Sequence, residues 1–135
     1  MNIQAVKIKM TQIFKEDKVI PVTLVLAEVA ESLKEGDSVK VSGITKGKGF
    51  QGVVKRWGFS GGPKTHGQKN RHRAPGSIGN TSPQRVIKGR RMAGRTGGKR
   101  VTLKMIVEGV DKDKKMLFLK GSTPGNNGSR LKIKF

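Results

Sequence analysis

The chain has 135 residues, of which 29 are lysine or arginine and 9 are aspartate or glutamate, so its formal net charge at pH 7 is +20. We expect a chain of this length to form one domain with a modest core, and so large a positive charge favours a polyanionic partner, either nucleic acid or an anionic membrane. Cysteine is absent, which excludes a disulfide framework and a thiolate metal site.

The N-terminal part of the chain is predicted to form short strands. Residues 3–8 and 18–26 are rich in Val, Ile and Leu with polar residues between them, which predicts two strands joined as a hairpin. Residues 27–35 fit either a short helix ended by Gly36 or the tail of a strand, because some of their apolar residues fall at helical spacing. Residues 38–42 alternate between apolar and polar, which predicts a half-buried strand.

Regular alternation returns near the C-terminal end. Apolar residues alternate along residues 101–107, and a polar turn at residues 111–114 follows. The four apolar residues 116–119 are typical of a strand covered on both faces. After a turn at residues 124–128, residues 130–135 alternate without a break. About six short strands without helical periodicity predict a small antiparallel β-barrel, whose closure removes exposed edges.

A long basic segment interrupts these strands. Residues 46–100 contain fifteen Lys or Arg residues and thirteen of the chain's nineteen glycines, and no acidic residue occurs between Asp37 and Glu108. Large apolar side chains are sparse there, so we expect the segment to take a fixed shape only when an acidic partner neutralises it. The predicted fold is therefore all-β, with a barrel body at residues 1–45 and 101–135 interrupted by a basic, mostly irregular extension.

The glycines of this extension suggest a nucleotide site, which its charges exclude. Residues 47–52 fit G-x-G-x-x-G, but a dinucleotide fold needs an acidic residue about 20 positions later, and a kinase needs aspartates after the loop. We expect the glycines instead to let the backbone approach phosphates, with Lys46 and Lys48 beside them. No Ser–His–acid arrangement and no thiol nucleophile is present, so the chain is not expected to be an enzyme.

Aromatic and imidazole rings lie among the cations of the extension. Trp57 follows Lys55 and Arg56 directly, an arrangement that can stack unpaired bases or pack the root of the extension onto the barrel. His66 and His72 lack the cysteines or carboxylates that a zinc site needs, so we expect them to contact phosphates or bases, the alternative being solvated loop residues.

Arginine dominates the second half of the extension, and its guanidinium groups can grip phosphate oxygens in a bidentate way. The predicted RNA-binding residues are Lys46, Lys48, Lys55, Arg56, Trp57, Lys64, His66, Lys69, Arg71, His72, Arg73, Arg85, Lys88, Arg90, Arg91, Arg95, Lys99 and Arg100.

An anionic membrane is the less favoured partner. Membrane-surface binding would need an amphipathic helix with an apolar face, which the glycines and prolines of the extension disfavour. No apolar run approaches the roughly 20 residues that span a bilayer, and the N-terminus does not have the pattern of a secretory signal. We expect a cytoplasmic RNA-binding protein without metal, cofactor or small-molecule substrate.

The sequence KGKGFQGVVKR at residues 46–56 resembles the universal large-subunit ribosomal protein L-three family. The resemblance continues through MTQIF (10–14), THG (65–67), HRAPGSIG (72–79), KGRRMAG (88–94), LKG (119–121) and PG (124–125). It implies a structural protein of cytoplasmic ribosomes that binds 23S-type large-subunit rRNA directly, supports early subunit assembly and contacts neighbouring large-subunit proteins.

The resemblance also implies a translation-protein-like barrel body and an extension whose tip approaches the peptidyl transferase centre. By position, the tip would be Asn80, Thr81, Ser82 and Pro83. By this resemblance, the chain is shortened relative to the family between about Leu26 and Glu35, where further barrel strands normally occur. The sequence therefore does not decide whether the barrel closes. A stand-alone or engineered RNA-binding barrel, or an RNA chaperone derived from the family, is the alternative function.

Overall fold

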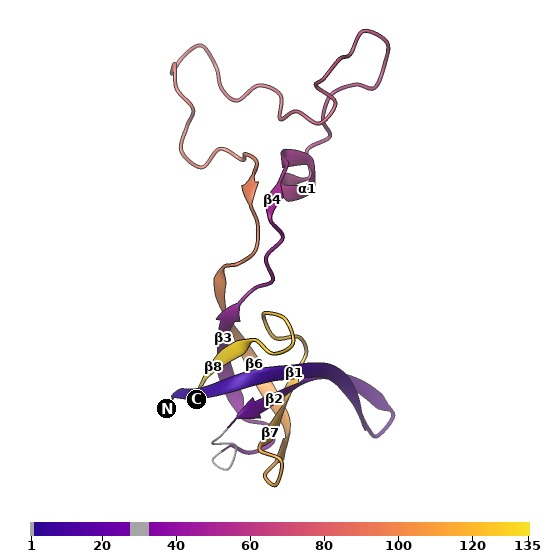
Figure 1. Ribbon diagram of the computed structural model, residues 1–135, viewed down its shortest axis with the longest axis vertical. Helices are drawn as coiled ribbons and strands as arrows, with labels where there is room; N and C mark the ends of the chain where they lie inside the picture. The colour runs from indigo at the N-terminus through magenta and orange to yellow at the C-terminus, as the bar shows by residue number, and fades with distance from the viewer. Residues whose placement is uncertain (1, 28–32) are drawn as a thin grey trace. The chain divides into compact units, whose positions relative to one another are not determined.

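The chain folds as two compact units (Figure 1). The computed structural model describes residues 2–27 and 33–135. One unit comprises Met1–Lys46 and Gly98–Phe135, and the other comprises Gly47–Gly97. The regular secondary structure described in the first unit is all β-strand, whereas the second unit is mostly irregular.

Six strands of the first unit close into an antiparallel barrel, in the order β1-β2-β7-β6-β3-β8. These strands are β1 (Asn2–Lys15), β2 (Lys18–Ala27), β3 (Ser38–Ile44), β6 (Arg100–Asp111), β7 (Met116–Lys120) and β8 (Arg130–Lys134). The predicted all-β barrel is confirmed, and the barrel is closed. Closure matters because every strand then has a hydrogen-bonding neighbour on both sides.

Strand β8 completes the barrel between β1 and β3. Its residue Ile133 lies opposite Ile3 of β1 on one side and Val41 of β3 on the other. The predicted hairpin of β1 and β2 is also confirmed, since Lys15 pairs with Lys18 around a two-residue turn. Both strands of the hairpin are longer than their apolar runs indicated.

The core consists of inward-facing residues of these strands, which alternate with exposed ones as expected for a half-buried sheet, together with Leu33 from the segment before β3. Its buried members are Ile3, Ala5, Val25, Ala27, Leu33, Val39, Val41, Met105, Val107, Leu117, Leu119, Leu131 and Ile133. The predicted strands at residues 38–42 and 101–107 therefore supply core residues, as does the last strand.

Leu103 lies on the same face of β6 as Met105 and Val107, as predicted, but it is 41% exposed. Two other sequence predictions need correction. Met116 and Phe118 are only half-buried, so β7 is covered on one face and not on both, because no second layer covers the outside of a single barrel. The alternation of β8 ends at Lys134, and Phe135 is 40% exposed.

The segment predicted as either helix or strand tail, residues 27–35, is described only at its ends. Ala27 is the last residue of β2, and residues 33–35 are not helical. Residues 28–32 lie outside the described residues.

A buried lysine fastens a long loop to β1. Lys7 is 5% exposed, and its Nζ donates hydrogen bonds to the carbonyl oxygens of Thr123 at 2.8 Å and Gly125 at 3.1 Å. The Lys7 backbone also bonds to Gly128 and Ser129. Burial, with a smaller effect from the charge of Lys46, lowers the pKa of the Lys7 ammonium. The side chain stays inside because two carbonyl oxygens replace part of its hydration.

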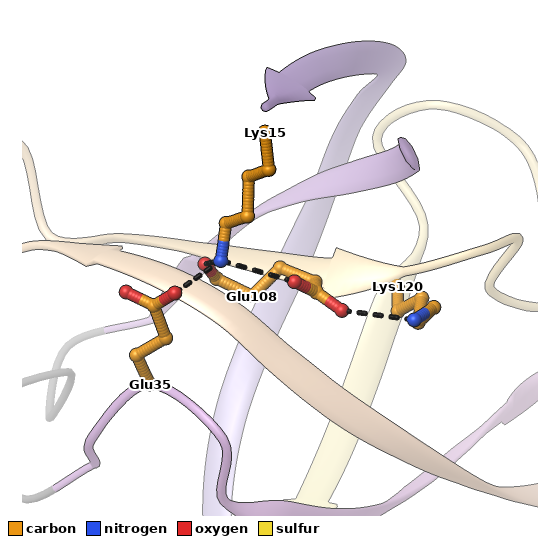
Figure 2. A network of polar contacts seen from close by, with 4 residues as sticks. All are labelled: Lys15, Glu35, Glu108 and Lys120. Atoms are coloured by element: carbon orange, nitrogen blue, oxygen red, sulfur yellow. Dashed lines mark hydrogen bonds and ion pairs between the residues drawn. The ribbon is translucent and has the colours of Figure 1, made fainter. Parts of the chain in front are cut away.

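An ion-pair network crosses the outside of the barrel (Figure 2). Lys15 pairs with Glu35 and, at 3.1 Å, with Glu108, whose other oxygen lies 3.2 Å from Nζ of Lys120. Hydrogen bonds from Lys15 and then Lys120 lower the pKa of Glu108. Hydrogen bonds to Glu35 and then Glu108 raise the pKa of Lys15. Strands β1, β6 and β7 are thereby linked through Glu108.

Replacing Glu108 with glutamine should lower the melting temperature of the barrel by roughly 2–5 °C at pH 7, the range expected for a partly exposed ion-pair network. Because the pKa of Glu108 is lowered by folding, its contribution is complete above the ordinary value of 4.5 and is lost as the pH falls through the folded-state pKa. Because folding raises the pKa of Lys15, its contribution to stability is lost only at pH values above the ordinary lysine pKa of 10.5.

Thermal unfolding of both proteins between pH 3.5 and 7 checks this prediction. The difference between them should narrow below pH 4.5. Asp113→Asn is the control, because Asp113 makes no ion pair with any described residue. A difference that stays constant down to pH 3.5 would contradict the assignment.

The second unit contains three short elements, which are β4 (Phe50–Gln51), α1 (Val53–Trp57) and β5 (Gly94–Arg95). Strands β4 and β5 form a two-stranded sheet. Within residues 2–27 and 33–135, no helix is long and apolar enough to cross a membrane.

Candidate nucleic-acid interface

The cations of the Gly47–Gly97 unit are directed to solvent. Nearly all of its Lys and Arg residues are exposed, and none forms an ion pair with a described carboxylate. Large apolar residues are exposed as well, including Phe50 at 72% and Ile87 at 62%. The unit therefore has almost no core of its own, and its shape depends on glycine conformations and on backbone hydrogen bonds.

The short sheet brings the two ends of this unit together. Phe50 pairs with Arg95 and Gln51 with Gly94, and the ladder continues where Lys48 donates to Thr96 and Thr96 donates to Gly49, both at 2.9 Å. The residues between these ends therefore form one long loop that the short sheet closes at its base.

Helix α1 was not predicted, although its end has a recognisable signal. Gly58 adopts the left-handed conformation at φ 73° and donates to the carbonyl oxygen of Val54, which closes the last turn. Lys55 and Arg56 lie in that turn, where cations interact favourably with the helix dipole. A glycine directly after a basic turn is the pattern that could have revealed this helix.

Two arginines gather around the single tryptophan. The indole Nε1 of Trp57 and Nη1 of Arg56 both donate to the carbonyl oxygen of Met92, each at 2.8 Å. The guanidinium carbons of Arg56 and Arg91 lie 5.2 Å and 5.5 Å from the indole ring centroid. These distances are within the range of cation–π attraction.

This cluster gives Trp57 a packing role that neither predicted alternative included, while base stacking by its exposed surface remains a prediction. The residue packs inside the extension, against the segment that contains Arg91 and Met92, and keeps 41% of its surface exposed. A Cβ atom at Gly94 would lie 2.5 Å from Nη1 of Arg56, so a larger residue there would displace this guanidinium group. The sequence did not indicate that Met92 and Gly94 lie next to Arg56 and Trp57.

The two histidines are placed differently. The Nδ1 atom of His72 bonds to the carbonyl oxygen of Pro63 at 3.2 Å, and the His72 carbonyl accepts from the amide of Gly62 at 3.0 Å. A Cβ atom at Gly61 would lie 2.1 Å from that carbonyl, so only glycine permits this closure. His72 thus has a role within its own loop, whereas His66 is exposed.

The loop closed by His72 surrounds an open hollow of about 470 Å³. Phe59 and Pro75 contribute apolar surface to it, and Gln68 and Arg71 contribute polar groups. No three His, Asp or Glu side chains of the described chain come close enough to hold a metal ion.

The predicted tip, Asn80 to Pro83, is exposed along its whole length. The amide of Arg85 donates to the carbonyl of Pro83 at 2.8 Å, and Arg90 donates to the carbonyl of Ser77, so both flanks of the tip are tied back to the chain. The remaining predicted RNA-binding residues are distributed along the sequence from Lys46 to Arg100 and are exposed. An interface of this kind suits an extended polyanion better than a compact ligand.

The sequence model described as Ribosomal protein L3 matches residues 6–124 of this chain. The chain is 50% identical over 103 residues to the Large ribosomal subunit protein uL3 of Dehalococcoides mccartyi, which covers 75% of this chain and 50% of that protein. It is 57% identical over 102 residues to the protein of that name from Chloroherpeton thalassium, covering 74% and 49%. It is 45% identical over 127 residues to the protein of that name from Chlorobium phaeobacteroides, which covers 93% of this chain and 61% of that protein. The chain spans about half the length of the first two relatives.

Proposed function

This chain belongs to the ribosomal protein L3 family, and from this membership we propose that it is a structural constituent of the large ribosomal subunit that binds large-subunit rRNA directly. The unit Gly47–Gly97, together with Lys46, Lys99 and Arg100, which flank it in the sequence, is the rRNA-binding extension, and the barrel is its body. The protein acts in cytoplasmic ribosomes, beside neighbouring large-subunit proteins, and needs no cofactor.

The observation that carries this proposal is the unpaired charge of the extension. Fifteen cations lie between Lys46 and Arg100 without an acidic residue among them, and none is paired with a described carboxylate. RNA phosphates would neutralise these cations and release condensed counterions. The exposed backbone around the glycines gives phosphates and 2′-hydroxyls further partners, so specificity comes from the fit of the whole segment.

The tip Asn80–Pro83 is the part that we propose to lie nearest the peptidyl transferase centre, with early assembly as the role of the whole chain. The tie from Arg90 to Ser77 supports a defined course for the chain on either side of this tip. Such a course fits a segment enclosed by RNA, where each bend has to pass between helices.

Salt titration of rRNA binding tests the proposal. If the extension neutralises about ten phosphates, log affinity of the full chain should fall with log salt at a slope of roughly −7 to −9. Filter binding to transcribed large-subunit rRNA between 50 and 400 mM KCl measures it. A slope near zero would refute direct phosphate binding.

A second measurement separates a ribosomal constituent from an RNA chaperone. A constituent stays with large subunits through a high-salt wash and sediments with them, because its extension is enclosed. Quantitative release of the chain into the supernatant would instead identify transient binding.

A further inference from the structure

The outside of the barrel carries a second concentration of positive charge, across the neighbouring strands β6, β3, β8 and β1. Side chains at alternate positions of these strands point outward, since their neighbours in sequence form the core. Six outward cations define what we call the basic barrel face: Lys40, Arg100, Lys104, Arg130, Lys132 and Lys134. All six are exposed.

Three of these lysines lie in one row across three strands. Lys40 of β3 is directly opposite Lys104 of β6 on one side and Lys134 of β8 on the other. Like charges in directly opposite positions of a sheet destabilise it. The four strand segments that form the face, residues 2–6, 38–44, 100–106 and 130–134, contain no Asp or Glu.

Beside the row of three lysines, the barrel surface has a hollow lined by hydrogen-bonding groups. It has a volume of about 380 Å³, and Arg100, Arg130 and Lys132 line it together with Asn2, Gln4 and Ser42. The hydroxyl groups of Ser42 and Thr102 are 2.7 Å apart and bond to each other. Guanidinium, ammonium, amide and hydroxyl groups together match phosphate oxygens and ribose hydroxyls.

We propose that the basic barrel face is a second RNA-binding surface, which holds the phosphate backbone of an RNA strand along the Lys104–Lys40–Lys134 row and in the adjoining hollow. The inference rests on the proposed function, because that function makes RNA the polyanion available to this chain. Ile44 and Ile106 are exposed at the margins, but lysine, which protein interfaces disfavour, occupies the centre. RNA is therefore favoured over an acidic protein.

The test is the full chain with Lys40→Gln, Lys104→Gln and Lys134→Gln. Because the repulsion disappears, the melting temperature of the barrel should rise by roughly 2–6 °C. Three lost phosphate contacts should weaken binding to large-subunit rRNA on the order of a hundred-fold at ~0.1 M salt, and should make the salt slope shallower by about 2. Stability and affinity thus change in opposite directions.

The matched control removes the same charge elsewhere on the barrel. This hairpin control carries Lys9→Gln, Lys18→Gln and Lys112→Gln, at exposed lysines outside the basic barrel face. Its melting temperature should stay constant, and its salt slope should change by less than about 1, since only long-range attraction is lost.

Several results would overturn the inference. A fall in melting temperature would make the three lysines structural, and an rRNA affinity equal to that of the hairpin control would remove the face from the RNA interface. Binding to polyglutamate, a model acidic protein, should be measured on the same variant, and its loss with unchanged rRNA binding would assign the face to an acidic protein. If rRNA binding requires the extension but not these lysines, the proposed function stands and only this second surface fails.

Discussion

Replacing six cations of the extension with glutamine is expected to weaken rRNA binding at least a thousand-fold at ~0.1 M salt, because each lost phosphate contact removes about 0.7 from the salt slope. The variant changes Lys64, Lys69, Arg73, Arg85, Lys88 and Arg95. All six are exposed, and none makes a side-chain hydrogen bond or ion pair with a described residue. The slope itself should become shallower by about 4.

The choice of these six excludes arginines that also shape the extension. Arg56 and Arg91 contact Trp57, and Arg90 bonds to Ser77, so their removal would alter structure and charge together. Filter binding over a KCl series and thermal unfolding should be measured on the same preparations. The barrel should unfold within about 1 °C of the parent protein, since surface changes outside packed or paired positions have small effects.

The hairpin control again provides the comparison, which is the loss of rRNA affinity per charge removed. If the six-residue variant and the hairpin control lose the same affinity per charge, the attraction to RNA is non-specific and the extension contributes no more than the rest of the surface. If the six-residue variant lowers the melting temperature by several degrees, these cations contribute to folding and the RNA interpretation is wrong.

Truncating Ile133 to alanine is expected to cost about 2–5 kcal/mol of barrel stability, the range for removing a large buried aliphatic side chain. Ile133 is completely buried and lies opposite both Ile3 and Val41, so the cavity would open where β8 joins β1 to β3. Neighbouring strands cannot collapse into it without losing the pairing that closes the barrel.

Urea unfolding monitored by circular dichroism measures this loss. Ile44→Ala is the matched control, because the same side chain at that position of β3 is 62% exposed and its removal should cost less than about 0.5 kcal/mol. Equal costs for the two substitutions would mean that β8 does not contribute to the core as described.

The sequence predicted the strands of the barrel because alternation of apolar and polar residues depends only on local geometry. Along β3 and β8, Val39, Val41, Leu131 and Ile133 were identified as inward-facing from that period alone, and all four are buried. The absence of acidic residues from 46 to 100 similarly indicated a segment that could not pack on itself. Membership of the L3 family was predicted from motifs that lie mostly within the same segment, and the family match over residues 6–124 confirms it. The assignment of individual residues to RNA contacts remains a prediction.

Tertiary structure decided the relations between residues distant in the chain. Periodicity shows which face of a strand is inward but not which strand lies beside it, so neither the closure by β8 nor the position of Lys40 between two lysines was evident. The hydrogen bond of Trp57 to Met92 spans 35 residues, and that of Lys7 to Thr123 spans 116. Such contacts depend on which distant segments the fold brings together, and local sequence patterns do not indicate this. The extension was apparent from its composition alone, whereas the basic barrel face exists only because strands far apart in sequence become neighbours.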